Sequence, residues 1–142
     1  MAGRRNTALI AVATSLIAAG LGAGGVQSAS AATATLNIQR YQDQYGTYNY
    51  VAVSGAVSAW YGFGSRVAVR VWGEDQWDDD LLDGPANADF DGLYFTRAVW
   101  LSDSTLDEDW DGRDEIYAGV RVYDSAGRQR ETVETNRVYG YW

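Results

Sequence analysis

Apolar and polar residues alternate along most of the chain after residue 32, with the period of a half-buried β-strand. The alternation is cleanest in two stretches where every second residue is apolar, 67–71 and 116–122. Val69 and Val120 lie in the middle of these stretches, so we expect both side chains to point inward. No window repeats its apolar residues at helical spacing over three turns.

Shorter alternations add further strands over 33–39, 51–57 and 93–101. Turns rich in glycine or small polar residues separate the strands, notably at 61–65 and 124–127. Short strands with regular turn signals between them are typical of two packed antiparallel sheets. We therefore predict an all-β fold, a single antiparallel β-sandwich of about seven or eight strands.

The start of the chain has the pattern of a secretory signal. Arg4-Arg5 gives a positive start, 7–19 is nearly all small and apolar, and Ala29-Ser30-Ala31 matches the small-x-small cleavage pattern. We predict cleavage after Ala31, a mature β-sandwich domain over 32–142, and a secreted, extracellular protein. An uncleaved membrane anchor is the alternative, although the apolar run is short for a span.

The composition narrows the range of possible functions. The net charge of −8 argues against a nucleic-acid partner, because phosphate binding needs positive charge. The chain has no histidine and no cysteine, which excludes a Ser-His-Asp triad, a thiolate nucleophile, an ordinary zinc site and a disulfide framework. Of the common catalytic chemistries, acid–base catalysis by carboxylates is still possible. The acidic residues, however, lie in turn-like, solvated stretches, which do not favour it. We therefore do not expect an enzyme.

The acidic residues concentrate in two predicted loops, 74–87 and 103–115. Loops separated by an even number of strands lie at the same end of a sandwich, so we expect these two to meet. Like charges gathered at one end destabilise a compact fold unless cations neutralise them. A solvated acidic surface that keeps the protein soluble is the alternative.

Asp107-x-Asp109-x-Asp111-Gly112 has carboxylates at alternate positions before a glycine, the arrangement in which a tight loop presents oxygen ligands to calcium. Ala118 stands where an EF-hand has its bidentate glutamate, so this is not an EF-hand, and Asp114 or Glu115 would complete the shell. A plain solvated turn is the alternative. The candidate calcium ligands from both loops are Asp107, Asp109, Asp111, Asp114, Glu115, Asp75, Asp79 and Asp80.

A second stretch, Asn87-x-Asp89-x-Asp91-Gly92, has the same form as the first. Asn, Asp and Gly are also the residues that a tight turn selects, so a hairpin competes with a metal site here.

Several segments together resemble the secreted transthyretin-like domains. Those domains have a V-x-G strand, a valine strand leading into a D-D-L-L-like loop, and a T-D-x-x-G-x-F hairpin; the matching segments here are 54–57, 67–75, 78–82, 89–95 and 116–122. Carboxypeptidase-regulatory-like sandwiches share the hairpin. The resemblance implies an extracellular, transthyretin-like (prealbumin-like) sandwich that binds something. The activity of the related hydroxyisourate hydrolases is not implied, because it uses histidine.

A competing resemblance is to the calcium-dependent lipid-binding sandwich of signalling proteins. Residues 69–75 followed by Asp79-Asp80-Leu81 are similar to its third calcium loop, although Gly73 stands where that family has an aspartate.

Two tryptophans, Trp77 and Trp110, lie inside the acidic loops, where a turn does not require a large aromatic side chain. They are candidate ligand-binding residues that would clamp a sugar ring, or they plug the end of the sandwich, which we expect more. Trp60, Trp72 and Trp100 are expected mostly in the core or on strand faces.

These inferences combine into a secreted, monomeric, non-catalytic binding module that calcium stabilises, with an extracellular protein or polysaccharide as partner and no membrane span. The alternatives are a carbohydrate-binding protein that uses Tyr and Trp faces, and a secreted inhibitor of an extracellular enzyme.

Overall fold

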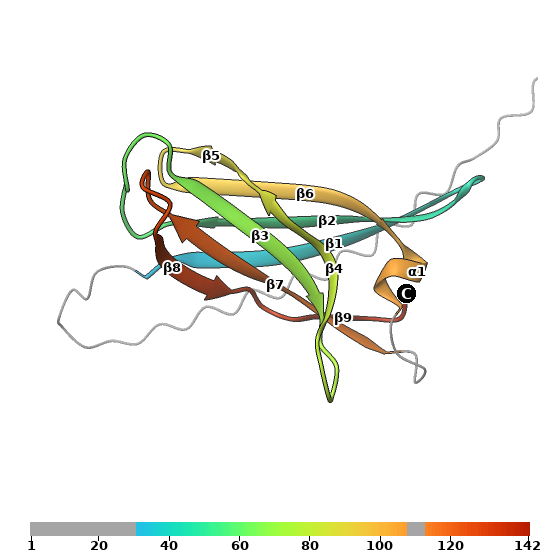
Figure 1. The fold of residues 1–142 in the computed structure, drawn as a ribbon. Coiled ribbons are helices and arrows are strands. Elements are labelled where there is room, and N and C mark those ends of the chain that lie inside the picture. Colours follow the sequence, from blue (N-terminus) through green and yellow to red (C-terminus); the bar gives the residue numbers. More distant parts are fainter. Residues whose placement is uncertain (1–30, 108–112) are drawn as a thin grey trace, which may run out of the picture.

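Two antiparallel β-sheets pack face to face in the structure, a computed structural model that describes residues 31–107 and 113–142 (Figure 1). One sheet has the order β1-β2-β6-β5, and the other has the order β4-β3-β7-β8 with β9 also paired to β7. The strands are β1 (Thr33–Asp43), β2 (Gly46–Ala56), β3 (Arg66–Gly73), β4 (Asp80–Asn87), β5 (Asp89–Asp91), β6 (Tyr94–Ser102), β7 (Asp114–Tyr123), β8 (Gln129–Glu134) and β9 (Val138–Gly140). A four-residue helix, α1 (Asp103–Leu106), follows β6.

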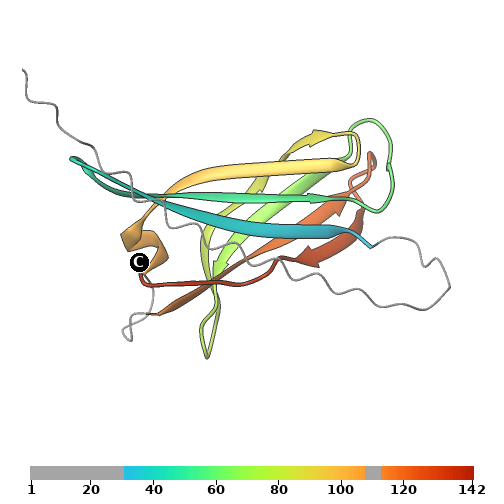
Figure 2. The same ribbon diagram turned by 180° about the vertical axis from the view of Figure 1, so that it is seen from behind.

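The predicted all-β antiparallel sandwich is therefore confirmed. The part of the chain that the structure describes has nine strands rather than seven or eight, because β5 and β9 are strands of only three residues. Seen from behind, β1, β2 and β6 form the near layer (Figure 2). No helix among residues 31–107 and 113–142 is long and apolar enough to cross a membrane. Residues 1–30 of the predicted signal segment lie outside the described residues.

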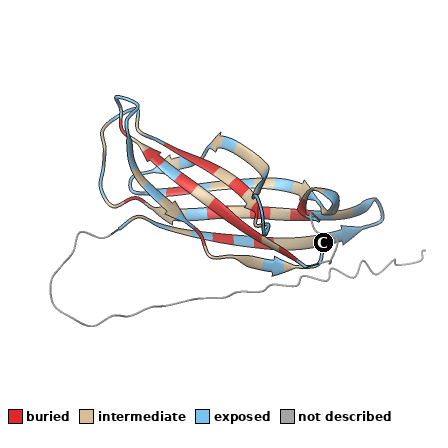
Figure 3. Cartoon of the chain, turned by 60° about the horizontal axis from the view of Figure 1, so that its bottom comes forward, coloured by how far each residue is buried: buried red, intermediate tan, exposed pale blue. Residues whose placement is uncertain are grey.

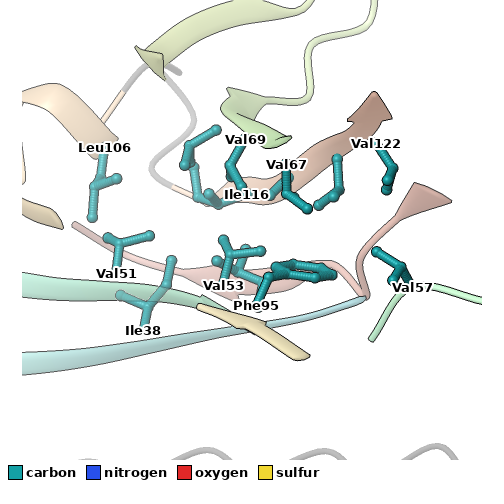
Figure 4. Close-up of a cluster of buried hydrophobic side chains, with 14 residues drawn as sticks. Ile38, Val51, Val53, Val57, Val67, Val69, Phe95, Leu106, Ile116 and Val122 are labelled. Carbon is teal, nitrogen blue, oxygen red and sulfur yellow. The ribbon is translucent and has the colours of Figure 1, made fainter. Parts of the chain in front are cut away.

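The core lies between the sheets and follows the predicted alternation. Val69 is 1% exposed and Val120 is 0% exposed, and the two are directly paired across β3 and β7. Side chains from both sheets meet in this layer (Figure 4), and Figure 3 shows buried residues along strands of both sheets. On β3 and β7 the outward residues Ala68 and Tyr117 are buried as well. Leu106 of α1 is also fully buried and covers one end of the core.

The prediction of a loop over 74–87 is wrong for most of that segment. Residues 80–87 form β4, and only 74–79 connect it to β3. Pro85 is tolerated because β4 is an edge strand, where a missing N–H breaks no interior ladder. After Ala88, whose N–H donates to the Val67 carbonyl at 2.8 Å, the chain continues as β5 in the other sheet.

Candidate functional site

The start of the first acidic segment lies beside the end of the second, at one end of the sandwich. Gly73, the last residue of β3, pairs with Ile116 of β7, and the N–H of Glu74 donates to the Glu115 carbonyl at 2.7 Å. The connection 74–79 therefore runs beside the start of β7, as the alternation of loop ends predicts.

Several carboxylates at this end already have protein partners. Glu74 forms an ion pair with Arg137. Asp79 accepts a hydrogen bond from the Tyr117 hydroxyl at 2.6 Å and another from the Asp75 N–H at 3.2 Å. Burial, and then the hydrogen bond to Asp79, raises the pKa of Tyr117 well above its ordinary value of 10.0, so the hydroxyl stays a donor.

The remaining described candidates do not converge. Asp75, Asp80 and Asp107 are exposed, whereas Asp114 is 2% exposed at the start of β7, beside half-buried Glu115. Among residues 31–107 and 113–142, no three acidic side chains gather closely enough to hold a metal ion. Asp109, Trp110 and Asp111 lie outside the described residues. Calcium binding at this end stays a prediction.

Trp77 does not plug the end of the sandwich. It is 89% exposed, because the 74–79 connection between β3 and β4 protrudes from the sandwich (Figure 1). The plug interpretation is therefore wrong for Trp77.

A different surface combines exposed aromatic side chains with neutral polar ones, and it lies on the outer side of β1, β2 and β6. The inward positions of these strands hold residues such as Leu36, Val51 and Phe95, so the alternate positions face solvent. The strand register aligns these outward residues in rows across the sheet. They are Thr33, Thr35, Asn37, Gln39, Tyr41, Tyr48, Tyr50, Ala52, Ser54, Ala56, Tyr94, Thr96, Ala98, Trp100 and Ser102, together with Asp43 and Gly46 at the turn from β1 to β2.

Asp43 lies at the turn; none of the other outward residues is charged, although the whole chain has 19 acidic and 11 basic residues. We call this surface the uncharged face. Asp43 borders it at the turn from β1 to β2, and Asp89 and Asp91 border it on the short edge strand β5, where they pair with Thr96 and Tyr94. The face thus offers hydroxyl, amide and aromatic groups in a chain of net charge −8.

Three aromatic side chains cluster on the uncharged face. The Trp100 ring centroid lies 5.0 Å from that of Tyr50 and 5.4 Å from that of Tyr41, with interplanar angles of 55° and 58°. The Tyr41 hydroxyl donates to Gln39 Oε1 at 2.7 Å, which fixes the orientation of that ring. Trp100 is nevertheless 58% exposed. The two tyrosines brace an indole that is presented to solvent.

Sequence reasoning placed Trp100 on a strand but did not find this cluster. Val99 and Leu101 point inward, which is a signal that Trp100 points outward. The pairing of β6 with β2, and of β2 with β1, is what brings Trp100 beside Tyr50 and Tyr41, and neither pairing is readable from one segment alone.

Comparison of the chain with protein-family models, curated proteins and solved structures finds no match. The resemblance to transthyretin-like domains therefore stays an interpretation of short motifs.

Proposed function

We propose that this protein is a non-catalytic carbohydrate-binding module, secreted as its first residues predict, that binds a neutral polysaccharide on the uncharged face. The observation that carries the proposal is the braced, exposed Trp100 on a face whose carboxylates lie at its borders. In an acidic protein, such a surface lets a neutral polymer bind without the cost of desolvating many carboxylates.

The chemistry of the face suits a sugar chain. An indole is a large, rigid, amphipathic surface, against which the apolar C–H side of a pyranose ring packs. Gln39 lies in the same cross-strand row as Trp100, and farther along the face the amide of Asn37 and the hydroxyls of Ser54 and Thr96 provide more donors and acceptors for sugar hydroxyls.

The shape of the face favours a polymer over a single sugar. Small ligands are usually enclosed in a concave site, whereas the uncharged face is the outer side of a sheet. Tyr94 and Trp100 stand near opposite ends of β6, about 20 Å apart at the rise of an antiparallel strand. An extended chain could contact both aromatic residues at once.

The first experiment is retention of the secreted protein on insoluble cellulose, chitin and starch. We expect retention on at least one of these neutral polymers. Because neither side of the contact is charged, added sodium chloride should leave the retained fraction unchanged. A protein that is retained on none of them, or that salt releases, would contradict the proposal.

Trp60 provides a matched control for Trp100. It is 57% exposed, close to the 58% of Trp100, and lies in the connection between β2 and β3 rather than at an outward strand position, with its ring centroid 5.2 Å from that of Phe63. Trp100→Ala should weaken binding at least about tenfold, because central aromatic residues dominate the binding energy of an interface. Trp60→Ala should leave binding intact.

A further inference from the structure

The outer side of the opposite sheet contains a second candidate site, independent of the uncharged face. An open hollow of about 210 Å³ lies over β3, β7 and β8, and its lining includes Arg70, Trp72, Gly119, Arg121 and Glu134. We call it the arginine hollow. Arg70 and Glu134 both pair with Gly119, from the strands on either side of it.

Gly119 forms the floor of the hollow. A Cβ atom at this position would lie 3.4 Å from Trp72 Nε1 and 3.9 Å from Trp72 Cδ1, with no backbone close by. Alanine would therefore just fit, whereas a larger side chain would occupy the hollow. The donor edge of the Trp72 indole lies at the wall above this floor.

Arg70 and Arg121 lie diagonally across β3 and β7, since Arg70 pairs with Gly119 and Arg121 pairs with Ala68. Diagonal neighbours of this kind are about 7–8 Å apart, which is within reach of two long side chains converging on one ligand. Within the described residues, neither guanidinium has an ion pair, a hydrogen bond or an aromatic ring contact.

The other arginines nearby differ from these two. Arg137 pairs with Glu74 and, at 3.7 Å, with Glu134, so the one carboxylate in the lining is partly neutralised. Arg66, on the same strand and side as Arg70, lies over the Tyr123 ring at 3.8 Å. In a chain of net charge −8, Arg70 and Arg121 stay available although carboxylates are plentiful.

We propose that the arginine hollow binds a small carboxylic acid, with its carboxylate held by Arg70 and Arg121 and its ring against Trp72. Guanidinium forks match a carboxylate in two parallel hydrogen bonds, and they keep their charge at any physiological pH. The volume is below the roughly 300–1,000 Å³ of a drug-sized pocket, so the ligand is a small ring-bearing acid.

Benzoate is a suitable probe, and the indole N–H signal of Trp72 in an NMR spectrum is a suitable reporter. Trp72→Phe assigns that signal. Sodium benzoate should shift it saturably, while benzyl alcohol, which keeps the ring but lacks the charge, should not. Sodium sulfate at matched ionic strength tests the need for the ring, and we expect it to bind at least about tenfold more weakly.

Arg70→Gln and Arg121→Gln should each weaken benzoate binding at least about tenfold, because each removes a charge-assisted hydrogen bond. Gly119→Val should abolish binding by filling the hollow without changing a charge. Arg66→Gln is the matched control, with the same charge change on the same strand, and should bind like the parent.

Three results would overturn the proposal. They are the absence of a saturable shift with benzoate, an equal loss of binding in Arg66→Gln, and sulfate or benzyl alcohol binding as well as benzoate. Each is distinct from failure of polysaccharide binding, because the uncharged face shares no residue with the arginine hollow.

Discussion

Tyr50 lies directly across the sheet from Trp100, and their ring centroids are 5.0 Å apart at an interplanar angle of 55°. Tyr41, two strands away from Trp100, reaches over β2 to contact the same indole at 5.4 Å. Tilted aromatic pairs of this kind stabilise the arrangement of the rings by more than the burial of their surface area alone. The indole is therefore held in place before any ligand arrives, which reduces the entropy lost on binding.

Tyr50→Ala should weaken polysaccharide binding about two- to tenfold, even though Tyr50 itself is only partly exposed. The loss of one aromatic pair is worth about 0.5–1.5 kcal/mol, and it frees the Trp100 ring to move. Binding isotherms would measure the effect. Tyr139→Ala on β9 is the control, since that tyrosine belongs to the other sheet. Equal losses in both variants would contradict the bracing role.

Val120→Asp should lower the free energy of unfolding by at least about 3 kcal/mol, because it places a charge in the layer between the sheets. Chemical denaturation of the purified protein measures the change. Ala98→Asp makes a similar substitution at an outward position of β6 and should cost much less. If the two variants unfold at the same denaturant concentration, the assignment of inward and outward faces is wrong.

The turn after β7 should make the stability of the protein depend on pH in the acidic range. The Asp124 carboxylate accepts hydrogen bonds from the N–H groups of Ala126 and Arg128, both at 2.9 Å, and from Arg128 Nε at 3.0 Å. The hydrogen bonds from Arg128 are the main cause that holds the pKa of Asp124 below its ordinary value of 3.8. The contribution of the Asp124 carboxylate to the free energy of unfolding is thus present above about pH 4, and it is lost as the pH falls through the lowered pKa.

Asp124→Asn should therefore be less stable than the parent at neutral pH, and the gap should narrow as the pH falls below about 4. Urea denaturation at a series of pH values measures both curves. A variant whose curve stays parallel to that of the parent through this range would show that Asp124 is not the titrating group.

Calcium should stabilise the protein through the acidic segments. At a calcium concentration one hundred times the dissociation constant, one site adds about 2.7 kcal/mol. In a domain of this size, that raises the melting temperature by roughly 10 °C. Asp109→Asn keeps the shape of the side chain and removes one ligand charge, so it should abolish most of the shift.

Sodium chloride at matched ionic strength is the control for simple screening of the acidic residues. If salt and calcium raise the melting temperature equally, or if Asp109→Asn keeps the full calcium response, the segment around Asp107 is an acidic turn and no metal site.

The sandwich could be predicted from the sequence because its central strands alternate strictly. Val69 and Val120 occupy inward positions that the pattern alone identifies. The boundaries of β4 could not be predicted, because adjacent Leu81 and Leu82 break the alternation and Pro85 favours a turn. Only the pairing with β3 shows that this segment is an edge strand.

The candidate sites could not be predicted, because they depend on which strands pair and in which register, and one segment's pattern does not reveal that pairing. Trp77 and Trp100 are both largely exposed, at 89% and 58%, yet one extends from a connection and the other packs against two tyrosines of separate strands. Likewise, Arg70 and Arg121 are 51 positions apart and meet around Gly119 only because β3 pairs with β7 in this register.

The most direct test of the uncharged face is a pair of depletion isotherms on the polysaccharide that retains the parent protein. Trp100→Ala and Trp60→Ala remove the same side chain at nearly the same exposure, 58% and 57%, from different surfaces. We predict that Trp60→Ala binds like the parent and that Trp100→Ala binds at least about tenfold more weakly while melting at a similar temperature. Equal affinities for the two variants would contradict the account.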